Sequence, residues 1–282
     1  MKIKTFYKIY YRHRFNKASN FLKVYLIFAF VIKYIINFFY FPKKINLDDY
    51  SLKNSHLFGK NLNFLCEHFN SDKGENFINQ YTQPSKKDKK IITAHGYAKI
   101  YDKYLSEVRN NISNVIELGS FYGNASAALF FYLKNSRIYS ADIHPDMYLY
   151  SSKRLINFYT DTSSRESIEK NILKKNIKYD LIIEDASHML KDQILSFFIL
   201  FKSLKQGGLF FIEEIDFPEK REDMRTDQEL PDLKTIFKKT LNKKNFQSKY
   251  ITENEKNYFL ENIASIEFYN GNINQIAIIK KK

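Results

Sequence analysis

From residue 91 onward, short apolar runs alternate with amphipathic stretches, and this alternation constrains the fold more than any other feature of the sequence. The runs are short enough for buried strands, while the stretches between them carry apolar residues at helical spacing. Such alternation is typical of βαβ units built around a parallel sheet. We expect strands at 114–120, 137–143, 155–160, 179–185 and 209–215, and helices at 97–108, 124–135, 146–154, 164–175 and 190–205.

The end of the chain predicts a different strand arrangement. Residues 263–281 contain two alternating runs joined by Asn270-Gly271-Asn272, which is a strong hairpin signal. Upstream, Gly207 and Gly208 predict the end of helix 190–205. We therefore predict an α/β fold with a Rossmann-like, doubly wound, mostly parallel seven-stranded sheet and a C-terminal antiparallel hairpin.

The 282 residues are enough for one large α/β domain, and no stretch is rich enough in Pro, Gly or Ser to act as a flexible linker. We expect a basic, aromatic-rich helical extension over 1–50 and one domain over 51–282. Within that domain the polar, Pro-interrupted stretch that opens 216–260 suits a mobile lid. Cys66 is the only cysteine, which excludes an intrachain disulfide and favours a reducing, cytoplasmic location.

The formal net charge of +14 is concentrated at the N-terminus. Residues 1–47 hold ten Lys or Arg and no acid, which leaves only +4 for the rest of the chain. A basic nucleic-acid-binding face on the domain is therefore weakly supported, and nucleic acid is an unlikely partner.

Residues 21–41 approach the length of a membrane-spanning helix, but Lys23 and Lys33 interrupt them. The uncharged run 24–32 is too short to cross a bilayer, and no small-residue cleavage site indicates a signal peptide. We expect this helix to pack against the domain or a sister subunit. The alternative is a basic, aromatic helix on an anionic membrane surface, and a true span is the least favoured interpretation.

The carboxyl ends of the predicted strands carry the candidate binding residues, because ligands of open α/β sheets lie there. Gly119 and Gly123 form a turn that opens a helix, but their spacing fails the G-x-G-x-x-G pattern of dinucleotide-binding folds. Asp142 could accept hydrogen bonds from both hydroxyls of a ribose. Asp161 could meet an adenine amino group, or it could cap the helix that starts near Ser164.

Three further acids, Asp185, Glu213 and Glu214, follow neighbouring strands. Unpaired, they would raise one another's pKa values, whereas a bound divalent cation would remove the repulsion. Oxygen ligands favour Mg²⁺ or a similar hard ion. His188 would face the same cleft as a proton acceptor, although it could equally cap the following helix.

These residues lie in segments that resemble the class I S-adenosylmethionine-dependent methyltransferases. The segments are "VIELGSFYGNAS", "IYSADIHPD", "YDLIIEDASHMLKDQ" and "LKQGGLFFIEEIDF". Within that class they are similar to the metal-dependent sugar O-methyltransferases of the macrocin and mycinamicin type. The family motif Asp-Asp-Gly-Ser-His stands here as Glu184-Asp185-Ala186-Ser187-His188, and Glu214 stands where the family commonly has Asp.

The resemblance implies a metal site of Asp185, Glu213 and Glu214, with His188 as the general base. It implies that the methyl donor contacts a second set of residues at the strand ends: Glu117, Gly119, Ser120, Gly123, Asp142 and Asp161. "SDKG" and "HGY" resemble the two halves of the family's entry motif, separated here by an insertion at 75–94. They make Lys73, His95 and Tyr97 candidates for substrate contact.

The sequence thus predicts an S-adenosylmethionine- and Mg²⁺-dependent O-methyltransferase of a sugar hydroxyl. A nucleotide-activated sugar, such as a heptose for bacterial capsule or surface polysaccharide, is the first acceptor considered. The alternatives are a glycosylated natural product, a catechol-type substrate, and a non-catalytic, membrane-tethered nucleotide-binding scaffold. We expect a cytoplasmic enzyme, with peripheral contact to the inner face of the membrane through residues 1–44 and homo-oligomers as open possibilities.

Overall fold

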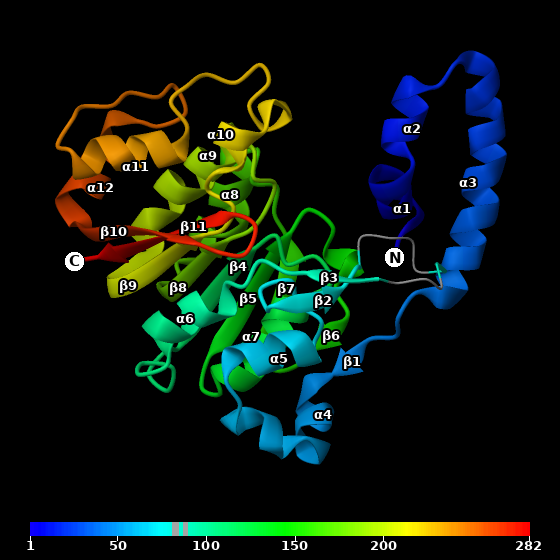
Figure 1. Ribbon diagram of the computed structural model, residues 1–282, viewed down its shortest axis with the longest axis horizontal. Helices are drawn as coiled ribbons and strands as arrows, with labels where there is room; N and C mark the ends of the chain where they lie inside the picture. The colour runs from blue at the N-terminus through cyan, green and yellow to red at the C-terminus, as the bar shows by residue number, and fades with distance from the viewer. Residues whose placement is uncertain (81–84, 87–89) are drawn as a thin grey trace.

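The computed structural model describes residues 1–80, 85–86 and 90–282, and a single seven-stranded sheet forms its centre (Figure 1). The strand order is β10-β11-β9-β8-β4-β5-β7. The five strands from β9 to β7 run parallel to one another, whereas β11 is antiparallel to both β9 and β10. Their bounds are β4 (Asn114–Leu118), β5 (Arg137–Asp142), β7 (Leu155–Tyr159), β8 (Tyr179–Glu184), β9 (Leu204–Ile212), β10 (Ile263–Asn270) and β11 (Gln275–Lys281).

Helices cover both faces of the sheet, which therefore separates two hydrophobic cores. One core is built with α5 (Leu62–His68), α6 (Ala98–Leu105) and α7 (Asn124–Tyr132). The other is built with α8 (Arg165–Asn171), α9 (Leu190–Leu200), α11 (Leu233–Leu241) and α12 (Glu253–Asn262). The central strands are apolar on both faces because both faces are covered. The predicted fold class is confirmed, including the C-terminal hairpin at the sheet edge.

Several predicted boundaries shift in the structure. The predicted helix at 146–154 is wrong: the segment forms a 3-10 turn, Pro145–Met147, and the short strand β6 (Tyr150–Ser151). Helix 164–175 ends earlier as α8 and continues as a 3-10 turn, Leu173–Lys175. Gly207 and Gly208 do not end a helix, because α9 stops at Leu200 and both glycines lie within β9. Both glycines lie in the irregular part of the β8–β9 pairing, between the paired residues Leu204 and Leu209.

The N-terminal extension forms a helical hairpin beside the domain. Its elements are α1 (Ile3–Tyr10), α2 (Arg12–Lys17) and α3 (Asn20–Tyr40). Phe6 and Tyr11 pack against Phe30 of α3 with ring centroids 5.9 and 5.2 Å apart. In Figure 1 the hairpin stands at the right of the sheet with α3 outermost. A connecting segment then leads through β1 (Ile45–Asn46), which pairs with β6, to α4 (Leu47–Lys53).

The segment 216–260 is only partly lid-like. It begins with α10 (Phe217–Lys220) and a polar, mostly exposed stretch. It then enters α11, where Leu233, Ile236 and Phe237 are fully buried against the core. The lid role therefore stays a prediction for the part that precedes α11. The insertion at 75–94 contributes two short paired strands, β2 (Asn76–Ile78) and β3 (Ile91–Thr93), and its residues 81–84 and 87–89 lie outside the described residues.

Candidate active site

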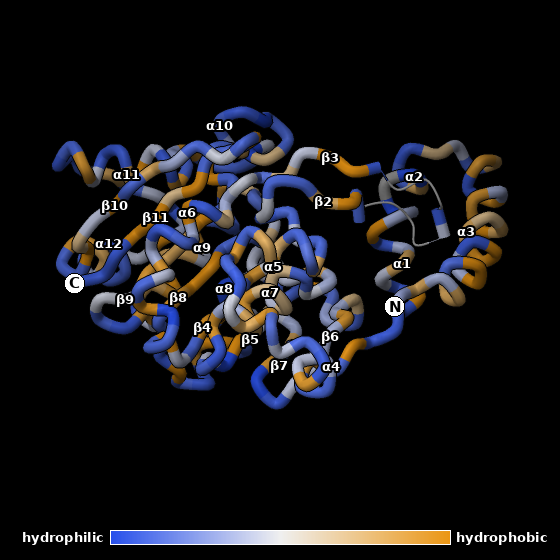
Figure 2. Tube along the Cα trace, turned by 60° about the horizontal axis from the view of Figure 1, so that its bottom comes forward, coloured by the Kyte–Doolittle hydropathy of each residue, from blue (hydrophilic) through white to orange (hydrophobic). Residues whose placement is uncertain are grey.

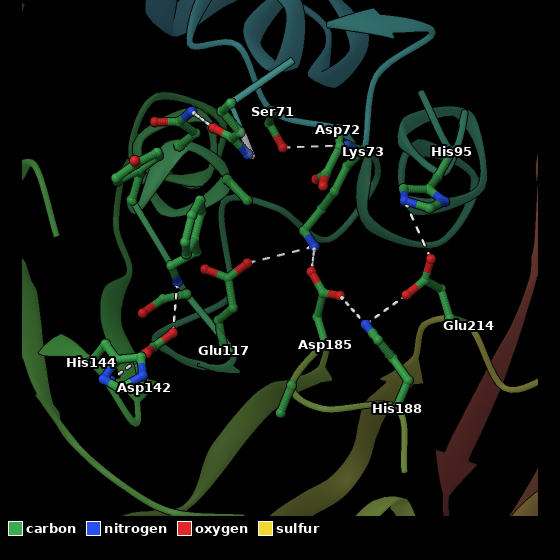
Figure 3. A pocket seen from close by; sticks show the side chains of 18 of the residues that line it. Ser71, Asp72, Lys73, His95, Glu117, Asp142, His144, Asp185, His188 and Glu214 are labelled. Atoms are coloured by element: carbon green, nitrogen blue, oxygen red, sulfur yellow. Dashed lines mark hydrogen bonds and ion pairs between the residues drawn. The ribbon is translucent and has the colours of Figure 1, made fainter. Parts of the chain in front are cut away.

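A cavity of about 300 Å³ opens at the carboxyl ends of β4, β5 and β8 (Figure 3). Its walls carry ten of the predicted site residues or their neighbours in the motifs: Lys73, His95, Glu117, Gly119, Ser120, Asp142, Ala186, Asp185, His188 and Glu214. A second cavity of about 480 Å³ shares Gly119, Asp142 and Ala186 with the first and extends to Asp161. The strand ends therefore gather the residues at the edge that the sequence predicted.

The glycine turn after β4 allows a close backbone approach. Gly119 has φ of +87°, and a Cβ there would lie 1.9 Å from the backbone oxygen of Asp185. Its amide donates to the carbonyl of Ala141 on β5 at 2.8 Å. Gly123, with φ of +82°, starts α7 beneath Tyr148, whose ring would lie 2.4 Å from an added Cβ. Only glycine satisfies both the conformation and the space at these positions.

The residues predicted to contact the methyl donor differ in whether the protein already supplies their hydrogen bonds. Glu117 is buried, accepts a hydrogen bond from the Ser126 hydroxyl at 2.6 Å, and has a pKa raised by burial. Asp142 accepts bonds from the amides of Phe121 at 2.8 Å and His144 at 2.6 Å. The Ser120 hydroxyl is buried at the cavity without a hydrogen-bond partner among the described residues. A buried, unpartnered hydroxyl is costly, which indicates that a ligand completes it.

Asp161 does not cap the following helix. Ser164 is the N-cap of α8 and accepts a hydrogen bond from the amide of Ser167. Asp161 instead accepts bonds from the amide and hydroxyl of Ser163 at 3.0 and 2.6 Å, on the wall of the second cavity. Its carboxylate is therefore still placed for the predicted contact with an adenine.

Lys73 is the cation that pairs with one cluster of acidic side chains. Its ammonium lies 2.5 Å from Asp185, 2.9 Å from Glu213 and 3.6 Å from Glu117. Tyr101 donates a short hydrogen bond to the other oxygen of Glu213. Burial lowers the pKa of the Lys73 ammonium, but Asp185 and Glu213 outweigh it and raise that pKa. We call these residues, Lys73, Tyr101, Glu117, Asp185 and Glu213, the closed cluster.

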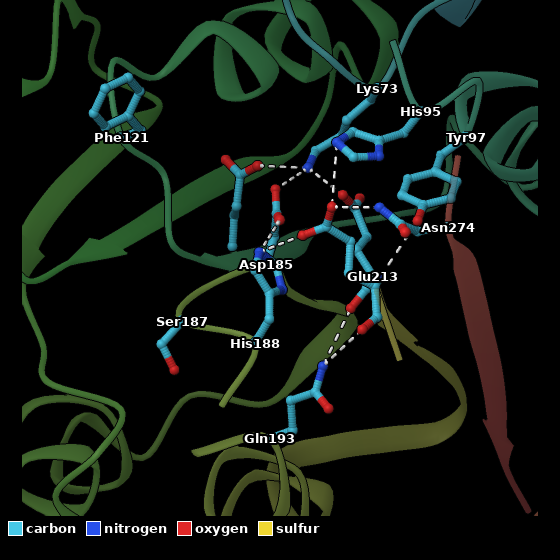
Figure 4. Close-up of polar contacts among 12 residues, drawn as sticks. Lys73, His95, Tyr97, Phe121, Asp185, Ser187, His188, Gln193, Glu213 and Asn274 are labelled. Atoms are coloured by element: carbon cyan, nitrogen blue, oxygen red, sulfur yellow. Dashed lines mark hydrogen bonds and ion pairs between the residues drawn. The ribbon is translucent and has the colours of Figure 1, made fainter. Parts of the chain in front are cut away.

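A second group shares Asp185 but contains no lysine. Nε2 of His188 lies 2.6 Å from one carboxylate oxygen of Glu214 and 3.7 Å from Asp185. Ligand atoms of Asp185, His188 and Glu214 all lie within 4.8 Å of one another, which is close enough to hold one metal ion. We call these three residues the open cluster. Figure 3 shows His188 between the carboxylates of Asp185 and Glu214, and Figure 4 shows Lys73 on the opposite side of Asp185 from His188.

Two residues of the open cluster have an unusual backbone conformation, and neighbouring side chains contact one of them. His188 and Glu214 have φ of +56° and +51°, which non-glycine residues rarely adopt and which gather at functional sites. Glu214 also accepts a bond from the Asn274 amide at 2.9 Å and lies 3.4 Å from Nε2 of His95. Tyr97 stacks on His95, with ring centroids 5.2 Å apart. His95 therefore lies beside the Glu214 carboxylate on the cavity wall, whereas the hydroxyl of Tyr97 accepts a hydrogen bond from the Glu214 amide at 3.4 Å.

The electrostatics of the open cluster suit a cation. Burial lowers the pKa of His188, but the hydrogen bond and charge of Glu214 outweigh it and raise that pKa to about 9. The protonated His188 imidazole thus supplies a positive charge between the Asp185 and Glu214 carboxylates. Two carboxylates and one imidazole are also donors that divalent metals accept, so the residues present fit a bound metal ion.

The structure separates Glu213 from the other predicted metal ligands. Its carboxylate faces Lys73 and Tyr101, and burial together with Asp185 raises its pKa. His188, predicted as a base, takes the third place beside Asp185 and Glu214 instead. The metal role of Glu213 stays a prediction, because its two carboxylate oxygens already accept hydrogen bonds from Lys73 and Tyr101.

Sequence reasoning missed Tyr101 and Asn274. Tyr101 lies within the predicted helix 97–108, and nothing in the sequence indicates that its hydroxyl is buried against Glu213. Asn274 follows the Asn270-Gly271-Asn272 turn, so the hairpin that was predicted carries it to Glu214. A polar residue at the end of a hairpin loop near the sheet edge was the available signal.

Comparisons with known proteins confirm the resemblance seen in the sequence. No family model matches the chain. The chain is 25% identical over 128 residues to mycinamicin VI 2''-O-methyltransferase of Micromonospora griseorubida, covering 43% of this chain and 32% of that protein. The chain therefore spans about a third of the length of this curated relative.

Solved structures of MycE methyltransferase from the mycinamycin pathway share the fold. A form with Mg and SAH has a TM-score of 0.58 at 19% identity, covering 79% of this chain and 53% of that one. A form with Mg, SAH and mycinamycin VI has a TM-score of 0.56 at 19% identity, covering 79% and 54%. These similarities establish that the chain has a methyltransferase-type Rossmann-like fold.

Proposed function

We propose that this chain is an S-adenosylmethionine- and divalent-metal-dependent O-methyltransferase that acts on a sugar hydroxyl. The observation that carries the proposal is the open cluster, which lies on the wall of the same cavity as the glycine turn and Ser120. Support comes from the curated relative, whose name describes a 2''-O-methyltransferase, and from the fold shared with methyltransferases crystallised with Mg and SAH.

In the proposed complex the methyl donor lies along the carboxyl ends of β4, β5 and β7. Asp142 and Asp161 face its nucleoside portion, and the Ser120 hydroxyl lies at the cavity that would hold the remainder. The glycine turn leaves space for the donor's close approach to the backbone. This arrangement brings the donor beside Asp185, because Gly119 contacts the Asp185 backbone.

Asp185, Glu214 and His188 are the residues that would hold the metal. When bound, such a cation lowers the pKa of a hydroxyl in contact with it. The chain's own residues position the acceptor and move its proton, because methyl transfer needs an oxygen that has lost its proton and faces the methyl group. Where His188 is not a ligand, its Nε2, which faces the cluster, takes that proton.

His188 has two possible roles, base or metal ligand, and one pair of measurements separates them. As the base, His188→Ala abolishes methyl transfer but keeps metal and donor affinity. As a ligand, the same variant loses metal affinity together with transfer. Retention of transfer by His188→Ala would remove His188 from both roles, and an unchanged rate after exhaustive chelation would remove the metal.

The acceptor that the comparisons favour is a sugar attached to a natural product, because the relative's name and the mycinamycin VI complex both describe such a molecule. A nucleotide-activated sugar, including a heptose for surface polysaccharide, is the second candidate. Its support is the basic N-terminal segment, which could meet a diphosphate.

The proposed function is tested by mass spectrometry of candidate glycosides and nucleotide-sugars after incubation with the protein, S-adenosylmethionine and Mg²⁺. We expect one acceptor class to gain the mass of a single methylene, and only when metal is present. Calorimetry with SAH provides the independent arm. A chain that binds no SAH would be the non-catalytic scaffold, and the proposal would be wrong.

We also propose a cytoplasmic site of action at the inner face of the membrane, with residues 1–44 in peripheral contact with lipid. The single, buried Cys66 suits a reducing compartment. The charge of residues 1–47 suits the anionic cytoplasmic leaflet.

A further inference from the structure

The outer surface of α3 is a large apolar surface without a partner among the described residues. By length and composition α3 could cross a membrane, and only 11% of its most apolar window is buried. Exposed fractions reach 89% at Phe21, 79% at Phe39, 67% at Phe28 and 59% at Ile32. We call these residues, with the other exposed apolar side chains of α3, the apolar face. Such a surface on a water-soluble domain marks a binding site.

The opposite side of α3 is occupied by α1 and α2. Leu26, Phe30, Tyr34 and Asn37 follow one another at helical spacing and lie on that side, where the first three meet Phe6 or its neighbours. Figure 2 shows α3 at the outer edge of the molecule, with α1 and α2 between it and the sheet. The apolar face therefore points away from the domain, and the buried side of α3 packs on α1 and α2 of the extension. The prediction that this helix packs against the domain or a sister subunit stays a prediction.

Charge identifies the partner of the apolar face. Residues 1–47 carry ten basic side chains and no acid, and none of these ten forms an ion pair with another described residue. Two copies of this segment placed face to face would repel each other. An anionic lipid surface instead attracts the basic side chains while the aromatic side chains enter the boundary between headgroups and acyl chains.

The packing of α1 and α2 on α3 indicates whether α3 lies in the membrane surface or spans the bilayer. Lys4, Lys8, Arg12, Arg14 and Lys17 stand on the two short helices beside α3. If α3 crossed the bilayer with this packing intact, these side chains would enter hydrocarbon at roughly 2.5–3.5 kcal/mol each near its centre. A helix that lies in the interface keeps them among the headgroups.

We propose that α3 lies in the plane of an anionic membrane with its apolar face in the lipid, and that α1 connects this contact to the cavity. Ile9 of α1 lines the first cavity, and Lys8 and Arg12 line the second. The amide of Lys2 and the hydroxyl of Thr5 donate to Asp146, in the turn that follows Asp142, at 2.6 and 2.9 Å. Residues of α1 therefore connect the lipid contact of α3 to the walls of both cavities.

The test is sedimentation of the full chain with phosphatidylcholine vesicles, with and without phosphatidylglycerol. We expect binding only to the anionic vesicles, weakening as salt is raised. Phe28→Glu combined with Ile32→Glu should weaken binding by at least about tenfold, because both side chains leave the lipid. The matched control is Leu241→Glu, at the 53%-exposed end of α11 on the far side of the domain, which should bind as the wild type does.

Three outcomes would overturn the proposal. Equal binding by the double variant would exclude the apolar face. A wild-type dimer that the double variant dissociates, with no vesicle binding, would make this face a subunit interface. Resistance of membrane-bound protein to alkaline extraction would indicate a spanning helix. SAH affinity measured without vesicles should be the same in the double variant and the wild type. Loss of vesicle binding can therefore be distinguished from loss of the proposed methyltransferase function.

Discussion

The closed and open clusters share Asp185 and stand side by side at the ends of β4, β8 and β9, yet they balance their negative charge differently. The closed cluster contains its own cation, with the Lys73 ammonium 2.9 Å from Glu213 and 2.5 Å from Asp185. The open cluster has only His188 between its two carboxylates. One group of acids is therefore completed by the chain, while the other is completed by a proton or by a metal.

The largest effect is expected from removing the internal cation. Lys73→Met should lower the free energy of unfolding by about 3–5 kcal/mol, because it leaves buried carboxylates without their partner. Urea unfolding at neutral pH measures this. The loss should shrink at low pH, where protonation neutralises the carboxylates, and a loss that is independent of pH would mean that Lys73 contributes packing and not charge.

A smaller effect is expected where the backbone behind Asp185 is altered. Gly119→Ala should destabilise the protein more than Gly207→Ala by about 1–3 kcal/mol. Both glycines have positive φ, but an added Cβ meets Asp185 only at Gly119 and meets nothing within 4 Å at Gly207. Chemical denaturation of the two variants isolates the clash, and equal losses would show that the turn and Asp185 can move apart. Gly119→Ala should also weaken SAH binding.

A further effect concerns pH in the metal-free protein. His188 has a folded-state pKa of about 9, above the unfolded value of 6.5, so its stabilisation is complete below pH 6.5. That stabilisation should be lost as the pH rises through 9. Unfolding after chelation should show the decline in the wild type and in His56→Gln, whose histidine is exposed, but not in His188→Gln. An identical decline in His188→Gln would assign it to another group.

The smallest effect is expected at the surface ion pair nearest to the site. Lys99 lies 2.8 Å from Glu75, but its side chain is 74% exposed. Lys99→Met should therefore change the free energy of unfolding by less than about 1 kcal/mol. A loss as large as that of Lys73→Met would show that burial does not distinguish the two lysines.

The fold and the location of the site could be predicted because they depend on local patterns. Apolar runs of strand length and the Asn270-Gly271-Asn272 turn specify the sheet and its hairpin, and parallel strands bring their carboxyl ends to one edge. The prediction of a helix at 146–154 was wrong because this segment pairs with β1, and such a tertiary contact leaves no periodic signal in the sequence. The prediction that Gly207 and Gly208 end a helix was wrong because α9 stops at Leu200, and the glycines instead allow the irregular stretch of β9 between Leu204 and Leu209.

The division of the acids could not be predicted from their spacing. Glu213 and Glu214 are adjacent in sequence, but the positive φ at Glu214 turns their side chains to different partners. Lys73 was assigned to substrate contact because "SDKG" resembles an entry motif, and its approach to Asp185 across 112 positions of sequence is a tertiary contact. Sequence therefore identified which residues gather, but not which of them are already paired.

The central claim is that the open cluster, and not the closed one, holds the metal. It is tested by titrating Mn²⁺ into Glu214→Gln and Glu213→Gln and following free Mn²⁺ by electron paramagnetic resonance. Glu214→Gln should weaken binding by at least about tenfold, a loss of roughly 1.4 kcal/mol, while Glu213→Gln stays close to the wild type. Equal loss in both variants would show that Glu213 also binds the metal, and the distinction between the two clusters would be wrong.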